Sequence, residues 1–221
     1  MKFCLEVTGE LACFSRPEMK VERVSYDVIT PSSVRAIYEA ILWKPAIRWV
    51  PERIEVLSPI CWASIRRNEL GGKISFSNVK SAMKQGRGQL AQYIEEDRQQ
   101  RAGLLLRDVH YRLHARLEMT AQAGGDEPVA KYVEMFRRRA SKGQCINQPY
   151  LGCREFACDF KLVEDDSPAQ PAVQDLSRDL GWMLYDLDYT DPGDPQPRFF
   201  QARLAQGVLD IPAPHSPEIR G

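Results

Sequence analysis

The chain has 221 residues, of which 43% are apolar and 27% are charged. This balance is typical of a globular protein and excludes a disordered chain. No run reaches the ~18 to 20 apolar residues that a membrane span needs, and residues 1–4 read as the start of a strand rather than of a signal peptide. We therefore expect a cytoplasmic protein with no membrane contact.

The net charge is zero, but the charge is divided unevenly along the chain. Residues 1–163 hold 26 Lys/Arg and 19 Asp/Glu, whereas residues 164–194 hold one Arg and nine acids. The basic first part favours a polyanionic partner, although an ordinary surface with one solvated acidic loop explains the same numbers equally well.

Metal and cofactor sites are not expected. Six cysteines are scattered without a Cys-x-x-Cys pair, and only three histidines could complete a metal site, so reduced thiols are favoured. The sequence also lacks a glycine-rich phosphate loop and a Gly-x-Ser-x-Gly elbow, which argues against an NTPase or an ordinary esterase.

The first third of the chain predicts strands around one helix. Residues 3–7 alternate as a strand with one buried face, and residues 24–29 read as extended. Thr30 offers an N-cap oxygen and Pro31 suits the first helical position, which predicts a helix that Pro45 ends. Alternation within residues 43–69 predicts two or three further strands.

The middle of the chain predicts a polar insertion followed by a strand, a helix and a further strand. Residues 71–93 are rich in glycine and polar residues and predict an inserted loop or hairpin. Residues 109–117 predict a strand with a basic face. Apolar residues four, three and four apart then predict a helix over 128–142, ended by Gly143, and residues 156–162 alternate as another strand.

These elements predict an α+β fold with two parts. Residues 1–163 run in the order of a ferredoxin-like (RRM-like) domain, in which a split βαβ arrangement repeats. Residues 164–178 form an acidic, proline-containing linker. Residues 179–221 predict a small antiparallel β domain, in which Gln206-Gly207 turns the chain into a closing hairpin.

The second predicted helix is the best candidate for a polyanion contact. Its basic side chains suit phosphate, because guanidinium groups present forked donors and stack on bases. A solvated helix face is the alternative. The residues concerned are Lys131, Arg137, Arg138, Arg139 and Lys142.

Metal-free RNA cleavage is the chemistry that the available side chains could support. It needs a base near the 2′-hydroxyl, an acid near the leaving oxygen and a cation on the phosphate. Lys131, Tyr132 and Tyr38 could supply these roles, although a buried tyrosine is more often a packed aromatic. His110 and His114 have a suitable pKa but are expected to be surface or pairing residues.

Several blocks of the sequence resemble the CRISPR-associated Cas-five family, subtype I-C. They are Ser-Arg-Pro-Glu-Met-Lys-Val-Glu-Arg-Val-Ser-Tyr-Asp-Val at 15–28, Thr-Pro-Ser-Ser at 30–33, Trp-Lys-Pro-Ala-Ile-Arg-Trp at 43–49, Ile-Arg-Arg-Asn-Glu at 65–69, Asp-Arg-Gln-Gln-Arg-Ala at 97–102, Leu-Gly-Cys-Arg-Glu-Phe at 151–156 and Asp-Leu-Gly-Trp-Met-Leu at 179–184. The blocks occur in order over nearly the whole chain.

The resemblance implies a RAMP protein of the Cascade surveillance complex. Such a protein binds the 5′ handle of CRISPR RNA (crRNA) and cuts the precursor repeat without metal, leaving a 2′,3′-cyclic phosphate. The expected partners are crRNA, its precursor, the Cascade backbone and large subunits and, as a further candidate, target DNA. The family's catalytic pattern matches in part: Leu42 stands where a proton-transferring group is expected, and Tyr132 follows Lys131 where a histidine is expected.

Two alternatives remain open at this point. The chain could be a scaffold that only binds the handle, or a general single-strand RNA chaperone with equal affinity for unrelated RNA. For handle binding we predict contacts from basic and aromatic residues in the first of these blocks, 15–28, and in the fourth, 65–69. These residues are Arg16, Lys20, Arg23, Tyr26, Arg66 and Arg67.

Overall fold

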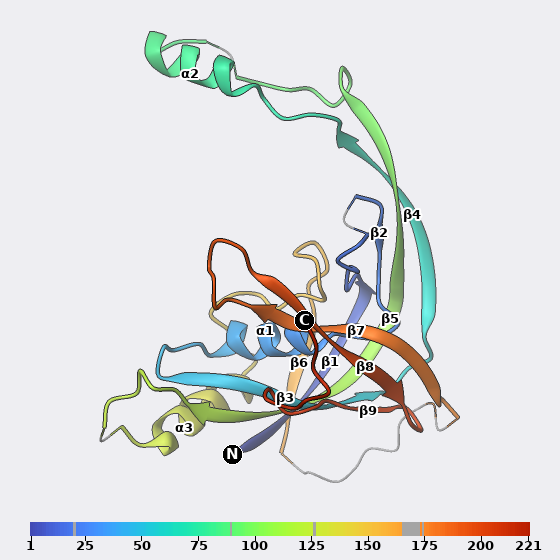
Figure 1. Ribbon diagram of the computed structural model, residues 1–221, viewed down its shortest axis with the longest axis vertical. Coiled ribbons are helices and arrows are strands. Elements are labelled where there is room, and N and C mark those ends of the chain that lie inside the picture. The colour runs from blue at the N-terminus through green and yellow to red at the C-terminus, as the bar shows by residue number, and fades with distance from the viewer. Residues whose placement is uncertain (20, 89, 126, 165–172, 174) are drawn as a thin grey trace.

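A computed structural model describes residues 1–221 except 20, 89, 126, 165–172 and 174. The described part is a mixed α/β protein with a mostly antiparallel sheet and few helices (Figure 1). Its elements are β1 (Lys2–Ala12), β2 (Arg23–Val24), α1 (Pro31–Ile41), β3 (Ile47–Val56), β4 (Cys61–Leu70), α2 (Phe76–Gln85), β5 (Arg98–Met119), α3 (Val129–Ala140), β6 (Asp159–Val163), β7 (Arg178–Asp188), β8 (Gln196–Leu204) and β9 (Val208–Asp210).

The main sheet is organised around the long strand β5. Its path runs β6-β1-β5-β3-β9 with antiparallel neighbours, while β2 and β4 pair with the first half of β5. At Asp108 the backbone has a φ of +53°, at the point where β5 leaves β4 and begins to pair with β3. Aspartate tolerates this left-handed conformation better than most residues, so a bend is built into β5 there.

Helices α1 and α3 pack on one face of this sheet. Thr30 caps α1 by accepting a hydrogen bond from the Ser33 N–H, and Pro31 begins the helix, as the sequence predicts. Ring centroids of Phe3 on β1, Trp49 on β3 and Phe136 on α3 lie 4.5–5.8 Å apart. The ring of Tyr38 on α1 belongs to the same cluster, with its centroid 4.8 Å from that of Trp49 and 5.4 Å from that of Phe136, so the cluster packs both helices against the sheet.

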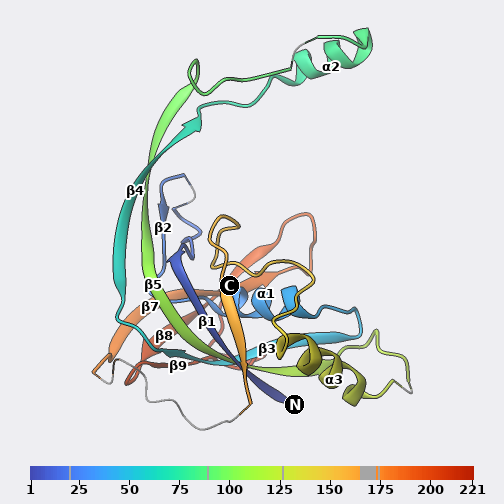
Figure 2. The ribbon, with the colours of Figure 1, turned by 180° about the vertical axis from the view of Figure 1, so that it is seen from behind.

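Residues 71–93 lie at the end of a long hairpin and contain a helix that the sequence did not predict. Strands β4 and β5 form a long arm that reaches away from the body, and the short helix α2 lies at its tip (Figures 1 and 2). Ser75 caps α2, and Gly86 ends it with a φ of +62°. The helix was missed because its polar residues and the glycines that follow it lack the apolar periodicity of a packed helix.

The C-terminal strands are tied to the main body. Strands β7 and β8 form a separate two-stranded sheet, and Arg35 on α1 donates two hydrogen bonds of 2.7 and 2.9 Å to Asp186 on β7. Gln206 and Gly207 form the predicted tight turn, with φ values of +52° and +76°. After this turn β9 pairs with β3 of the main sheet rather than closing the small sheet by itself.

Candidate functional site

The predicted catalytic lysine lies in the first turn of α3, beside an acidic residue that the sequence reading missed. Lys131 Nζ lies 2.5 Å from Glu127 Oε1 and 5.2 Å from the ring centroid of Tyr132. The Lys131 side chain is 52% exposed, whereas Tyr132 is 4% exposed. The Glu127 carboxylate also interacts with the Tyr132 hydroxyl and raises its pKa. Glu127, Lys131 and Tyr132 therefore form one polar cluster, which we call the Glu127 cluster.

The hydrogen bonds of this cluster set the protonation of its members. The bonds from Lys131 and Tyr132 lower the pKa of Glu127, while the bond to Glu127 raises the pKa of Lys131. The pKa of Tyr132 is raised, first by its bond to Glu127 and then by burial, and the opposing effect of the Lys131 charge is smaller. At neutral pH the cluster thus holds a carboxylate, an ammonium and a neutral phenol.

The Tyr132 hydroxyl does not become a usable base. A phenol is a poor base at neutral pH unless a neighbouring charge, such as that of Lys131, lowers its pKa. Glu127 outweighs the lysine, so the Tyr132 hydroxyl is suited to donate a proton and not to accept one. The spacing of Glu127 and Lys131, four residues apart, was the signal in the sequence that could have identified the carboxylate.

Tyr38 lies in the core and does not join the Glu127 cluster. Its hydroxyl donates to the carbonyl oxygens of Phe3 and Leu113, at 3.0 and 2.8 Å, and its ring stacks on Phe136 with centroids 5.4 Å apart. The residue is 0% exposed, and burial raises its pKa well above the usual value. Tyr38 thus matches the packed-aromatic alternative, and Leu42 is equally buried.

The basic C-terminal half of α3 divides into exposed and structural arginines. Arg139 is half-buried and donates to the carbonyl oxygen of Ile41, so it caps the end of α1. Arg137, Arg138 and Lys142 are exposed, and none of them forms an ion pair with another residue that the structure describes. These three side chains are available to a phosphate backbone.

Of the arginines predicted to contact the handle, Arg23 and Arg67 lie together, whereas Arg66 lies on the other face of β4. Arg23 lies 3.6 Å from Glu155, and Arg67 also pairs with Glu155, so this carboxylate joins side chains far apart in sequence. Arg66 alternates to the opposite face of β4 and is exposed. The two consecutive arginines therefore cannot contact the same stretch of RNA through one face.

The remaining predicted contacts have mixed outcomes. Arg16 lies 4.6 Å above the ring centroid of Tyr26 and 3.6 Å from Asp27. Tyr26 itself is 1% exposed, and its hydroxyl accepts a hydrogen bond from Leu184 N, so its ring is not accessible to a base in this conformation. Lys20 lies outside the described residues.

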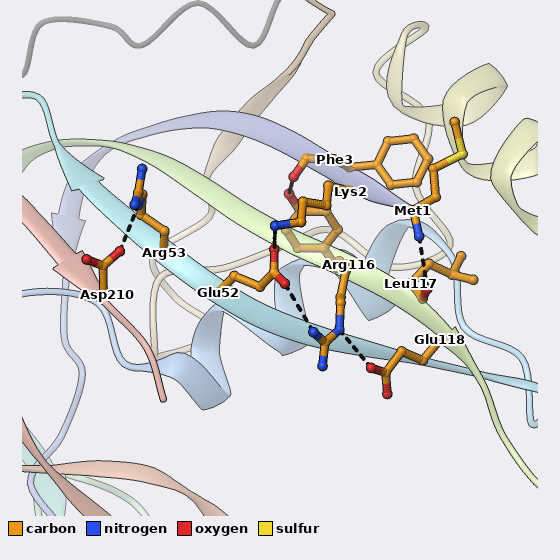
Figure 3. A network of polar contacts seen from close by, with 10 residues as sticks. Met1, Lys2, Phe3, Glu52, Arg53, Arg116, Leu117, Glu118 and Asp210 are labelled. Atoms are coloured by element: carbon orange, nitrogen blue, oxygen red, sulfur yellow. Dashed lines mark hydrogen bonds and ion pairs between the residues drawn. The ribbon is translucent and has the colours of Figure 1, made fainter. Parts of the chain in front are cut away.

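The predicted basic face of β5 is charge-paired. His114 lies 2.8 Å from Glu55, and His110 lies 3.1 Å from Glu6, which confirms that the histidines are pairing residues. Figure 3 shows Arg116 between Glu52 and Glu118, with Lys2 on Glu52 at 2.9 Å. Acidic neighbours thus neutralise this face, and it offers few free cations to an RNA.

In the part of the chain that the structure describes, no three His, Cys, Asp or Glu side chains gather where they could hold a metal ion. Likewise, none of the described helices is long and apolar enough to cross a membrane.

Solved structures and curated proteins resemble this chain over nearly its whole length. A structure described as a CRISPR-associated protein superposes with a TM-score of 0.72 at 20% identity, covering 100% of this chain and 97% of that one. The functionally uncharacterised protein SMU1763c from Streptococcus mutans superposes with a TM-score of 0.69 at 18% identity, with the same coverage. At these identities the likeness shows the fold alone.

Two sequence relatives are closer. A Mannheimia succiniciproducens protein named CRISPR pre-crRNA endoribonuclease Cas5d is 52% identical over 220 residues, covering 98% of this chain and 97% of that protein. A Thermus thermophilus protein of the same name is 41% identical over 228 residues, covering 95% and 90%. The family model described as CRISPR-associated protein (Cas_Cas5), of the Cas5d type, matches residues 3–212. The chain therefore belongs to the CRISPR-associated Cas-five family, in its Cas5d, subtype I-C branch.

Proposed function

We propose that this protein cleaves the repeat of precursor crRNA and holds the resulting 5′ handle. The observation that carries the proposal is the Glu127 cluster, which places a cation, a carboxylate and a phenol together at the start of α3. Relatives that are 52% and 41% identical carry the name pre-crRNA endoribonuclease, which supports the same activity.

The cluster can supply each role of a metal-independent cleavage. The Glu127 carboxylate accepts the proton of the RNA 2′-hydroxyl, whose oxygen attacks the neighbouring phosphorus. Lys131 stabilises the negative charge that develops on the phosphoryl oxygens. Tyr132 donates its proton to the departing 5′-oxygen, so the products are a 2′,3′-cyclic phosphate and a 5′-hydroxyl.

Tyr38 has no part in this scheme, because its hydroxyl is buried and bonded to two backbone carbonyls. The low pKa of Glu127 makes it a weak base, so a slow reaction is expected. Arg137, Arg138 and Lys142 continue along α3 from the cluster and are proposed to bind the phosphates of the same RNA. Arg23 and Arg67 are proposed to contact the handle.

The order of elements supports a finer description of the fold. Within the main sheet β6-β1-β5-β3 is the strand order of two split βαβ units, with α1 and α3 as the connecting helices. We therefore propose a ferredoxin-like RAMP domain over residues 1–163. The boundary to a small β domain at 179–221 stays a prediction, because β9 pairs with β3 across it.

We further propose that the protein works in the cytoplasm as a Cascade subunit, beside the backbone and large subunits, with target DNA as a further candidate partner. A scaffold that binds the handle without cutting is the second candidate function. It is favoured by one observation: the hydrogen bond from Lys131 lowers the pKa of Glu127 and makes this carboxylate a weak base.

Incubating the purified protein with its own repeat RNA in EDTA tests the proposal. We expect cleavage to a 2′,3′-cyclic phosphate, and a fall of about 100- to 1,000-fold in the single-turnover rate of the Lys131→Ala variant. Lys161→Ala, which removes an exposed lysine on β6, serves as the matched control. If the wild-type protein binds the RNA but leaves it intact, the scaffold is the correct function.

A further inference from the structure

A cavity of about 670 Å³ opens at the C-terminal end of α1, between this helix and residues 146–154. This volume lies within the range of small-ligand pockets. The N–H groups of Ile146 and Asn147 both donate to the carbonyl oxygen of Ala40, at 2.7 and 3.2 Å. These bonds satisfy a free carbonyl at the helix end and hold the two walls of the cavity in place.

Two aromatic side chains line this cavity without any ring partner. Trp43 is 55% exposed and Tyr150 is 37% exposed, and neither ring contacts another ring or a cation among the described residues. Trp182, which is 49% exposed in another cavity, differs because the guanidinium of Arg220 lies 5.6 Å from its ring centroid. Exposed aromatic rings that line a cavity and contact no other ring or cation, such as those of Trp43 and Tyr150, are typical of a binding site.

The polar groups around the two rings have unused hydrogen-bonding capacity. Within the described part of the chain, the side chains of Asn147 and Arg154 make no hydrogen bond or ion pair. Gln148 uses its Nε2 to donate to the Cys158 carbonyl oxygen at 3.0 Å, and its own side-chain oxygen accepts no hydrogen bond from a described residue. An amide carries both a donor and an acceptor and can therefore read the edge of a nucleobase.

The position of the cavity indicates which kind of ligand would enter it. Arg139 binds the carbonyl oxygen of Ile41, two residues before Trp43, and the Gln144 N–H binds Arg139 O at 2.9 Å. The exposed Arg137 and Arg138 precede this arginine on α3. An RNA strand that follows these cations away from the Glu127 cluster would reach the cavity at the other end of the helix.

We infer that this cavity binds one unstacked nucleobase of the single-stranded precursor crRNA. The base stacks on the exposed ring of Trp43. The side-chain amide of Asn147 hydrogen-bonds the edge of the base, and Arg154 binds an adjoining phosphate. The inference rests on the proposed function and deepens it. Besides the Glu127 cluster, which is proposed to cleave the RNA, it adds a second site that recognises one base of the RNA sequence.

The first test uses the wild-type protein and leaves its fold untouched. Each nucleotide of the repeat RNA is replaced in turn by an abasic one, and the dissociation constant is measured at fixed salt. Loss of one stacked base is expected to weaken binding by roughly 5- to 150-fold at a single position, given the usual strength of base–aromatic stacking. An even profile, with no position above about 2-fold, would overturn the inference.

The second test assigns that position to the cavity. In Trp43→Ala the unmodified RNA should bind more weakly by the same factor, and the abasic substitution at the sensitive position should then cost less than about 2-fold. Trp43→Phe should restore most of the affinity because it keeps a ring. Trp182→Ala is the matched control and should leave both dissociation constants unchanged.

The outcomes separate this inference from the proposed function. Failure of the wild-type protein to bind or cut its repeat would refute the proposed function, and the nucleobase site with it. Normal cleavage and an unchanged dissociation constant in Trp43→Ala and Asn147→Ala would refute the nucleobase site alone. The same holds if Trp43→Ala binds RNA normally but no longer associates with another Cascade subunit, because the cavity would then be a protein interface.

Discussion

Both ends of α3 carry basic side chains, but the two ends differ in whether these side chains are ion-paired. At the N-terminal end Lys131 is bonded to Glu127 and lies over the Tyr132 ring. Towards the C-terminal end Arg137 and Arg138 are exposed, without an ion pair among the described residues. A paired cation has a fixed position, which catalysis needs, whereas an unpaired one can follow the phosphates of a flexible strand. One basic run in the sequence thus contains both the proposed cleavage site and the proposed phosphate-binding surface.

Removing the carboxylate at the N-terminal end should have the largest effect. Glu127→Gln is expected to lower the single-turnover cleavage rate by about 100- to 10,000-fold, because it removes the proposed base. RNA affinity should stay the same or rise slightly, since one negative charge is lost. Glu134→Gln, an exposed acid on the same helix, is the control and should cleave normally. Equal rates for the two variants would remove Glu127 from the mechanism.

The two tyrosines provide the next contrast. Tyr132→Phe should slow cleavage by about 100-fold, because the proton donor is lost while the ring stays. Tyr38→Phe should change the rate by less than about 2-fold, but it should lower the free energy of unfolding by about 1–3 kcal/mol, since two buried carbonyls lose their donor. Single-turnover kinetics and denaturant unfolding of both variants measure these two effects. A Tyr38→Phe variant with slow cleavage and normal stability would contradict the assignment of Tyr38 to the core and of Tyr132 to the reaction.

At the C-terminal end the effect should appear in binding. The double variant Arg137→Ala/Arg138→Ala is expected to bind repeat RNA about 10-fold more weakly, and the slope of log K against log salt should become shallower by about 1.4, as two phosphate contacts to a single strand are lost. Cleavage at saturating RNA should not change. Arg203→Ala, an exposed arginine on β8, is the control. A lower saturating rate with an unchanged slope would place these arginines in the chemistry instead.

The smallest effect expected is that of pH on cleavage at saturating RNA. Glu127 acts as a base when ionised, and its pKa lies below the usual 4.5; Tyr132 acts as an acid when neutral, and its pKa lies above the usual 10. The rate should therefore fall only below about pH 4.5 and above about pH 10, with a plateau between them. A bell-shaped profile centred near pH 7 would indicate a histidine and would refute the assignment to the Glu127 cluster.

Local signals in the sequence identified several elements correctly. Thr30 and Pro31 predicted the start of α1, Gly143 predicted the end of α3, and Gln206-Gly207 predicted the turn before β9. Each of these depends on a few neighbouring residues, whose backbone preferences act within one turn of the chain. Lys131 became a candidate in the same way, through its neighbours and the family pattern.

Tertiary structure decided what these local signals could not. Tyr38 and Tyr26 are polar-tipped aromatics whose burial depends on the strands and helices packed around them, so their sequence positions did not reveal that they are inaccessible. Glu155 joins Arg23 and Arg67 from distant parts of the chain. Trp43 and Tyr150 line the same cavity only because residues 146–154 pack against the end of α1. The sequence by itself thus determined the ends of elements and one candidate catalytic lysine, Lys131. Burial and long-range contacts, which no local pattern encodes, determined which side chains are exposed to a partner.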